Sequence, residues 1–274
     1  MHSLAPTVLG WLAEGRPVRV ARVVQTHGIS SQDPAAAVAY SPGRPLAGEL
    51  FSGAAADRLP QLLESSDGLV NFVISEPAAA GAGLSCGGTA RLYVQDAGSV
   101  PAQAWSQLAA GRPVGLLTEL AGGQTRLVEP SERRSRHTLE ETELRASYWP
   151  TPRVLVVGTG QIADALAANA ALLEWECRIG PELPAELGPA DNVVVLDHDL
   201  DNSGRALTAA LAAGVGYLGA LGSRHTQARR AEWLAAHGVT DTKAIHGPAG
   251  LDIGSKTPAE IALSILAEIV SVRR

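Results

Sequence analysis

One stretch of the chain, residues 153–163, constrains the fold more than any other. Residues 153–157 (RVLVV) are typical of a buried β-strand, and a glycine-rich turn and a helical pattern follow directly. In such a turn Gly158 permits a tight bend, Gly160 lets the backbone approach a phosphate, and Ala163 leaves room for the helix to pack on the strand. The N-terminus of that helix would offer N–H groups and a positive dipole to an anion. The stretch therefore predicts the start of a nucleotide-binding βαβ unit and a phosphate-bearing ligand.

The rest of the second half alternates between helical and strand patterns. We expect a helix at 161–174, strands at 176–179 and 192–197, a helix at 203–212, a strand at 215–218 and a helix at 224–236. The last helix begins at Thr257, which forms a capping box with Glu260 and is followed by Pro258 at the first helical position. This order predicts a Rossmann-like parallel sheet covered by helices.

The first half mixes strands and helices without a regular βαβ order. We predict strands at 18–26, 36–40, 69–75 and 90–95, a hairpin at 113–120 and 124–128, helices at 4–15, 53–65 and 101–110, and a flexible loop at 78–83. Residues 129–152 are charged and polar and end in two prolines, so we interpret them as the linker between two domains. The fold class is then α/β, with a smaller mixed α/β domain at 1–148 and a Rossmann-like domain at 149–274.

Charge and cysteine content exclude several classes of protein. With a formal net charge of −6, the chain lacks the basic face of a general nucleic-acid binder, and its basic run at 133–136 (RRSR) is interpreted as a solvated part of the linker. Cys86 and Cys177 have no CxxC partners, which suits a reducing cytosol and argues against structural zinc. We find neither a signal-peptide pattern nor an apolar run of the ~18 residues that span a bilayer. We therefore expect a cytoplasmic protein with no membrane span.

Polar residues follow two predicted strands of the second half. Asp197, His198 and Asp199 come after a buried strand, where side chains point into the ligand crevice of an open parallel sheet. They could shuttle a proton or hold a polar ligand, or they could only cap the next helix. Residues 222–224 (GSR) follow the next strand, where Arg224 could bind an anion; here the alternative is an ordinary loop with Ser223 as N-cap.

Two more glycine-rich segments are candidates for ligand contact. The segment 246–254 (HGPAGLDIG), which contains Gly250 and Asp252, passes close to a ligand or packs tightly against the sheet. In the first half, Cys86 precedes Gly87 and Gly88 in a loop that enters a strand. These glycines would leave the sulfur accessible, so that its thiolate could bind a metal or a sulfur-containing ligand; the alternative is a cysteine buried in packing.

The identity of the phosphate-bearing ligand stays open at this point. A dinucleotide site usually has an acidic residue at the tip of the second strand, to hold the ribose hydroxyls. Here that strand, 176–179, ends in Gly180 and Pro181 with no acid at its tip, so a standard NAD site is doubtful. The glycines of the turn could also serve only to shape it. The chain has no Ser/His/Asp order, HExxH sequence or Walker A sequence.

Taken together, these segments resemble the XdhC/CoxI family, the accessory proteins of xanthine dehydrogenase and related molybdenum hydroxylases. The resemblance is carried by residues 84–88 (LSCGG), 158–163 (GTGQIA), 197–199 (DHD), 217–224 (YLGALGSR) and 247–262 (GPAGLDIGSKTPAEIA). It implies a chaperone that binds molybdenum cofactor (molybdopterin), protects it while its sulfido ligand is installed, and passes it to the apo-hydroxylase. The implied partners are a cysteine desulfurase and the xanthine dehydrogenase-like target enzyme.

The resemblance favours a cofactor chaperone over an enzyme and places the cofactor's phosphate at 158–160, with its molybdenum toward Cys86. The residues expected to contact cofactor are Cys86, Gly87, Gly88, Gly158, Thr159, Gly160, Gln161, Asp197, His198, Asp199, Gly222, Ser223, Arg224, Gly250 and Asp252. The first half departs from the family: 28–33 (GISSQD) stands where GSSPR is usual, and 52–57 (SGAAAD) where SGGC-E is usual. The alternatives are an NAD(P)-dependent oxidoreductase and a divergent member with a regulatory nucleotide- or partner-binding role. A homodimer is plausible.

Overall fold

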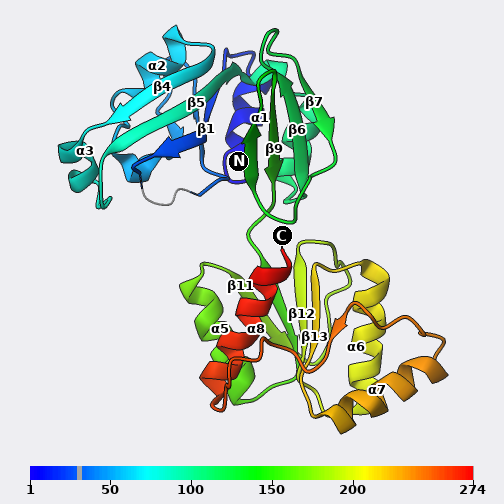
Figure 1. Ribbon diagram of the computed structural model, residues 1–274. Coiled ribbons are helices and arrows are strands. Elements are labelled where there is room, and N and C mark those ends of the chain that lie inside the picture. Colours follow the sequence, from blue (N-terminus) through cyan, green and yellow to red (C-terminus); the bar gives the residue numbers. More distant parts are fainter. Residues whose placement is uncertain (30–32, 274) are drawn as a thin grey trace. The chain divides into compact units, whose positions relative to one another are not determined.

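The computed structural model describes residues 1–29 and 33–273, which form two compact units. One unit spans Met1–Pro150, and the other begins at Thr151 (Figure 1). The first unit is the longer of the two, whereas we expected the smaller domain at this end of the chain. No helix in these described residues is long and apolar enough to cross a membrane.

The first sheet of the first unit is antiparallel and five-stranded, in the order β3-β2-β1-β5-β4. Its strands are β1 (Arg19–His27), β2 (Ala37–Tyr40), β3 (Ala47–Gly48), β4 (Gly68–Ile74) and β5 (Gly88–Asp96), and its helices are η1 (Phe51–Gly53), α2 (Leu59–Ser65) and α3 (Glu76–Gly81). A bulge between Val23 and Gln25 shifts the register of β1 against β5. The flexible loop predicted at 78–83 is wrong in part, because α3 forms there, with Ser75 accepting from the backbone N–H of Ala78 as N-cap.

The second sheet of this unit is also antiparallel, in the order β7-β6-β9-β8. Its strands are β6 (Val114–Glu119), β7 (Thr125–Val128), β8 (Arg136–Leu139) and β9 (Glu143–Tyr148), and α1 (Ala5–Ala13), η2 (Ala97–Ser99) and α4 (Ala102–Ala109) complete the unit. The predicted linker at 129–152 is therefore wrong, since two of these strands lie within it. Leu144, Ala146 and Tyr148 are buried in the core, while the half-buried charged residues Glu143 and Arg145 and the buried Ser147 obscure the apolar alternation in the sequence.

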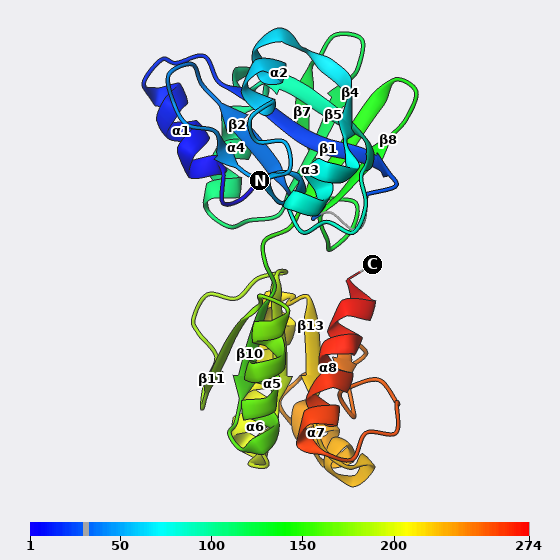
Figure 2. The same cartoon turned by 90° about the vertical axis from the view of Figure 1, so that its left-hand side faces the viewer.

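The second unit contains one parallel sheet in the order β11-β10-β12-β13-β14, so the expected Rossmann-like architecture is confirmed. Its elements are β10 (Arg153–Val157), α5 (Gln161–Leu172), β11 (Glu176–Gly180), β12 (Asp191–Val195), α6 (Leu200–Ala213), β13 (Tyr217–Ala220), α7 (Arg224–Ala236), β14 (Ile245–His246) and α8 (Pro258–Val272). Helices α5 and α8 cover one face of the sheet, and α6 and α7 cover the other (Figures 1 and 2). All five residues of β12 are buried, as expected for a central parallel strand between two helical layers.

Candidate functional site at the carboxyl edge of the parallel sheet

The sheet order of the second unit defines a topological switch point between β10 and β12. The chain leaves β10 toward β11 on one side, and β12 and β13 continue the sheet on the other. The loops after β10 and β12 diverge at such a point and leave a crevice that receives ligands in open parallel sheets. Here the backbone N–H groups of Leu196 and Asp197 donate to the carbonyl of Val157 at 2.8 and 3.2 Å, so the two loops start side by side. The structure thus brings Gly158 and Asp197, the first predicted site residues of each loop, together.

The two glycines of the turn after β10 have different roles. A Cβ on Gly158 would lie 2.9 Å from the backbone nitrogen of Asp197, so this glycine is required where the two loops approach each other. Gly160 has a φ of 113°, a Cβ there would meet no atom within 4 Å, and it is the N-cap of α5 without a side-chain cap. Thr159, Gly160 and Gln161 are all exposed. The backbone at the start of α5 is therefore exposed and suited to an anion.

The carboxylates after β12 are held within their own loop. Asp197 accepts from the backbone N–H of Asp199 at 2.9 Å and from the amide of Asn202 at 2.5 Å, and these bonds, that of Asn202 first, lower the pKa of its carboxyl. Asp199 caps α6 by accepting from the backbone N–H of Asn202 at 2.8 Å. This geometry supports the capping interpretation for both aspartates. His198, between them, is exposed, and no hydrogen bond within this loop involves its imidazole in the described structure.

The loop after β13 is also shaped by a cap. Ser223 is the N-cap of α7 and accepts from the backbone N–H of Thr226 at 3.2 Å. Gly222 has a φ of 141°, and a Cβ there would lie 3.0 Å from the side chain of Thr226. The loop-and-cap alternative therefore describes these two residues, while Arg224, the first residue of α7, is exposed.

The glycine-rich segment after β14 packs against α8. The carboxylate of Glu268 accepts from the backbone N–H of Gly250 at 2.8 Å, the hydroxyl of Tyr217 at 2.6 Å and the imidazole Nδ1 of His246 at 3.1 Å. A Cβ on Gly250 would lie 2.4 Å from the hydroxyl of Ser264. Tight packing is thus the role of Gly250. Asp252, two residues further on, is exposed.

Sequence reasoning did not identify Tyr217 or Glu268 as residues that organise this edge. Burial and the hydrogen bond to Glu268 raise the pKa of the Tyr217 hydroxyl far above its usual range, so it stays a donor. The available signal was Glu268 itself, which is a lone carboxylate in the last three turns of an otherwise apolar helix. A buried carboxylate requires donors, and the 246–250 segment supplies two of them.

In the first unit the thiol of Cys86 is exposed, which contradicts the buried-packing alternative. Its two following glycines are needed for close backbone approach. A Cβ on Gly87 would lie 2.6 Å from the carbonyl oxygen of Ile74, and one on Gly88 would lie 2.3 Å from that of His27. The loop therefore presents the thiol at the surface of a tightly packed backbone junction. Of the divergent segment 28–33, residues 30–32 lie outside the described part of the chain.

The predicted site residues thus belong to both units. Cys86, Gly87 and Gly88 lie in the first unit, and the remaining predicted residues lie in the second. The expectation that one cofactor has its phosphate at 158–160 and its molybdenum toward Cys86 stays a prediction. Within residues 1–29 and 33–273, no group of three or more His, Cys, Asp or Glu side chains is arranged to hold a metal ion.

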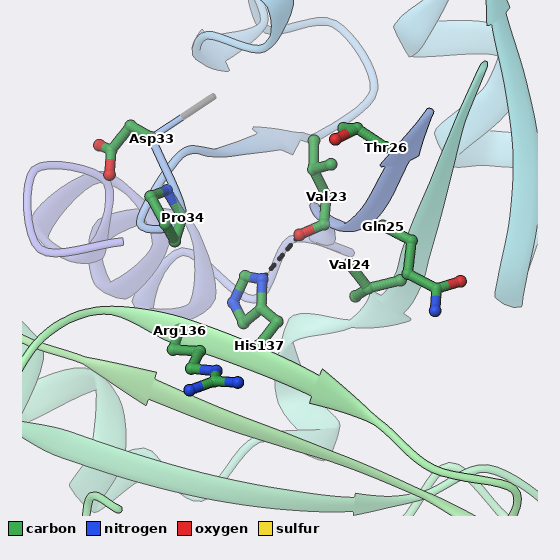
Figure 3. Close-up of a pocket in the computed structure, with 8 residues that line it drawn as sticks. All are labelled: Val23, Val24, Gln25, Thr26, Asp33, Pro34, Arg136 and His137. Atoms are coloured by element: carbon green, nitrogen blue, oxygen red, sulfur yellow. Dashed lines mark hydrogen bonds between the residues drawn. The ribbon is translucent and has the colours of Figure 1, made fainter. Parts of the chain in front are cut away.

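A cavity of about 230 Å³ in the first unit contains none of the predicted site residues. It is lined by Val23, Val24, Gln25, Thr26, Asp33, Pro34, Arg136 and His137 (Figure 3). The imidazole Nδ1 of His137 donates to the carbonyl of Val23 at 2.6 Å, and its Nε2 accepts from the hydroxyl of Tyr148 at 3.0 Å. Burial, with repulsion from the buried guanidinium of Arg22, lowers the pKa of His137 to about 3. This histidine is neutral across the physiological range and ties β8 to β1.

Comparison with known proteins agrees with the architecture of both units. A crystal structure described as a xanthine dehydrogenase from Bacillus halodurans has the same fold, with a TM-score of 0.59 and 18% sequence identity over 98% of this chain and 95% of that chain. The uncharacterized protein YqeB of Escherichia coli (strain K12) is 28% identical over 150 residues, which cover 44% of this chain and 27% of YqeB.

A second relative carries a functional description. The molybdenum cofactor insertion chaperone PaoD of Escherichia coli (strain K12) is 30% identical over 198 residues, which cover 69% of this chain and 61% of PaoD. The chain thus matches less than two thirds of the length of either curated relative. Residues 154–269 match the XdhC Rossmann domain. This range includes the loops at the switch-point crevice and the segment that packs on α8. The second unit thus matches an XdhC domain, as the resemblance of its motifs implied.

Proposed function

We propose that this protein is an accessory factor that binds molybdenum cofactor and supports its sulfuration and insertion into a xanthine dehydrogenase-type molybdenum hydroxylase. The observation that carries the proposal is the XdhC Rossmann domain, whose switch point has an open α5 N-terminus led by Gly160. The name of PaoD, a molybdenum cofactor insertion chaperone, supports the same role. The partners we infer are the apo-hydroxylase and a cysteine desulfurase, in the cytoplasm.

Each unit offers a group that suits one part of such a cofactor. The backbone at 159–161 is exposed at the positive end of a twelve-residue helix, which suits the phosphate of the pterin. The exposed thiol of Cys86 is a soft ligand of the kind that molybdenum accepts. When bound, the cofactor would carry the redox-active metal that the client hydroxylase needs. The protein's own part is to hold the phosphate, present a soft donor and keep the cofactor from solvent until transfer.

Binding can be tested with molybdenum cofactor released from a molybdoenzyme and, in parallel, with NADPH. After gel filtration, bound pterin is measured by fluorescence and bound nucleotide by absorbance. We expect about one pterin per chain and weaker retention by Cys86→Ala. Cys177→Ala is the matched control, because Cys177 is partly buried in β11 and burial raises the pKa of its thiol. Tight NADPH binding without retained pterin would favour the oxidoreductase alternative and reject the chaperone.

A second variant tests the phosphate end. Gly158→Val is unsuitable, because its side chain would press on the backbone of Asp197 and disturb the loop itself. Thr159→Glu instead adds a negative charge on an exposed side chain beside the α5 N-terminus, which should repel a phosphate without changing the fold. We expect at least a tenfold loss of pterin retention. Thr240→Glu, at an exposed position after α7, should leave retention unchanged; equal retention by both variants would place the phosphate elsewhere.

A further inference from the structure

The most unusual side chain near the crevice is a buried arginine on α7. Arg230 is only 2% exposed, although it lies in a strongly charged helical run that predicts a solvated face. Its neighbour Arg229 is exposed, as that pattern suggests. Among the described residues no carboxylate lies within ion-pair distance of Arg230. Burying a guanidinium without such a partner is costly, so its position calls for a reason other than a salt bridge.

Both terminal nitrogens of Arg230 donate to backbone carbonyls at the crevice. Nη1 donates to Leu221 at 2.6 Å, and Nη2 donates to Asp197 at 2.7 Å. These are short, charge-assisted hydrogen bonds to the residues that follow β13 and β12. The hydrogen bonds of the sheet stop near the ends of β12 and β13. Beyond them, the guanidinium of Arg230 links the two loops that follow these strands.

The same helix provides further contacts to the loop after β13. Gln227, one turn before Arg230, donates from its amide to the carbonyls of Ala220 and Gly222 at 2.8 and 3.3 Å. With the bond from Arg230 to Leu221, three consecutive carbonyls of this loop accept from α7. Arg230 also reaches the loop after β12, which no other α7 side chain does in the described part of the chain. The loop after β12 contains the exposed His198, and the loop after β13 leads directly into the exposed Arg224 at the start of α7.

We propose that Arg230 is the positioning residue of the crevice: its guanidinium holds the loops after β12 and β13 in the arrangement that receives a phosphate-bearing ligand, without contacting that ligand. Its ligand class rests on the proposed function. A lysine could reach one carbonyl but not both, because an ammonium lacks the planar fork of a guanidinium. A cavity of about 190 Å³ borders Arg230, so a small guanidinium compound could enter the space left by truncation.

The test compares Arg230→Ala, Arg230→Lys and the control Arg229→Ala. Amide hydrogen exchange is followed by NMR at Asp197 and Leu221, whose N–H groups donate to Val157 and Val195. Each exchange rate is compared with that of a reference amide, Trp175, which donates to Ala170 at the opposite edge of the sheet. We expect at least tenfold faster exchange at both loop amides in Arg230→Ala, and a smaller increase in Arg230→Lys. Arg229→Ala and the reference amide should match the wild type.

Pterin retention is measured on the same proteins with and without methylguanidinium. Retention should fall at least tenfold in Arg230→Ala, less in Arg230→Lys, and recover in Arg230→Ala when methylguanidinium is added. Loop exchange equal to the wild type in both Arg230 variants would overturn the proposal, as would faster exchange with full retention. If Arg230→Ala does not fold, unchanged loop exchange and unchanged pterin retention in Arg230→Lys would overturn the proposal. If the wild type retains no pterin, the proposed function fails, and the loop exchange rates then decide the role of Arg230 on their own.

Discussion

The neutral histidine in the first unit predicts a specific loss of stability in mild acid. In the unfolded chain a histidine takes up a proton near its ordinary pKa of 6.5, whereas His137 in the folded chain does so only near about 3. The unfolded state therefore binds more protons between these values, and stability falls as the pH drops through that window. The whole difference corresponds to about 5 kcal/mol, of which about 2 kcal/mol is lost between pH 7 and pH 5.

The structural reason is that every contact of this imidazole suits its neutral form. Nδ1 donates to the Val23 carbonyl, so Nε2 is the acceptor of the Tyr148 hydroxyl. A second proton would face that hydroxyl and would feel the positive charge of Arg22, which is 1% exposed. His137→Gln removes the titration and keeps a side chain that can donate to the same carbonyl.

The assay is urea unfolding of wild type and His137→Gln at pH 7, 6 and 5, followed by tryptophan fluorescence. We expect the wild type to lose about 2 kcal/mol more than the variant between pH 7 and pH 5. His225→Gln, on the exposed surface of α7, should follow the wild type at each pH. If wild type and His137→Gln lose stability in parallel over this range, His137 is not held neutral by its surroundings and the expected linkage is refuted.

Three further predictions concern the packing of α8 and can be read from thermal or urea unfolding. Gly250→Ala should destabilise the protein by about 2 kcal/mol or more, because residue 250 has a positive φ and the added Cβ would contact the hydroxyl of Ser264. The control is Gly254→Ala, whose Cβ would meet no atom within 4 Å and which should cost clearly less. Equal costs would contradict this prediction. Thr257→Ala removes the capping box and should cost about 1 kcal/mol, whereas no change would show that the cap is dispensable. Glu268→Ala should cost about 3 kcal/mol by leaving the buried hydroxyl of Tyr217 and the half-buried N–H of Gly250 unpaired, and a cost near zero would mean that water replaces the carboxylate.

The second unit was predictable to a large extent because its signals are local. The aliphatic run of β10, the glycine turn at 158–160 and the capping box at Thr257 each act within a few residues, and the structure has β10 and α7 at their predicted bounds. The first unit was harder to predict. Its strands β8 and β9 lie in a charged segment, and they form because β9 pairs with β6, a contact made across about 30 residues of sequence.

The candidate site divides along the same lines. Residue types alone identified which loops face the crevice, because the carboxyl ends of parallel strands always meet at one edge. They could not separate residues that bind a ligand from residues with a structural role. In the folded chain Gly158 packs against the backbone of Asp197, Asp197 accepts from Asn202, and Gly250 donates to Glu268.

By itself, the sequence determined a Rossmann-like second unit, a glycine-led helix start and a resemblance of that unit to the XdhC Rossmann domain. Hydrophobic period, turn chemistry and motif spacing are all local properties of the sequence. Only the tertiary structure decided which of those residues remain free for a ligand and which side chains hold them in place. Along the chain Arg230 looks like an ordinary charged residue, and the partners of Glu268 cannot be read from its neighbours. The roles of both come from burial, because a charge removed from water must find hydrogen-bond partners, and those partners come from segments distant in sequence.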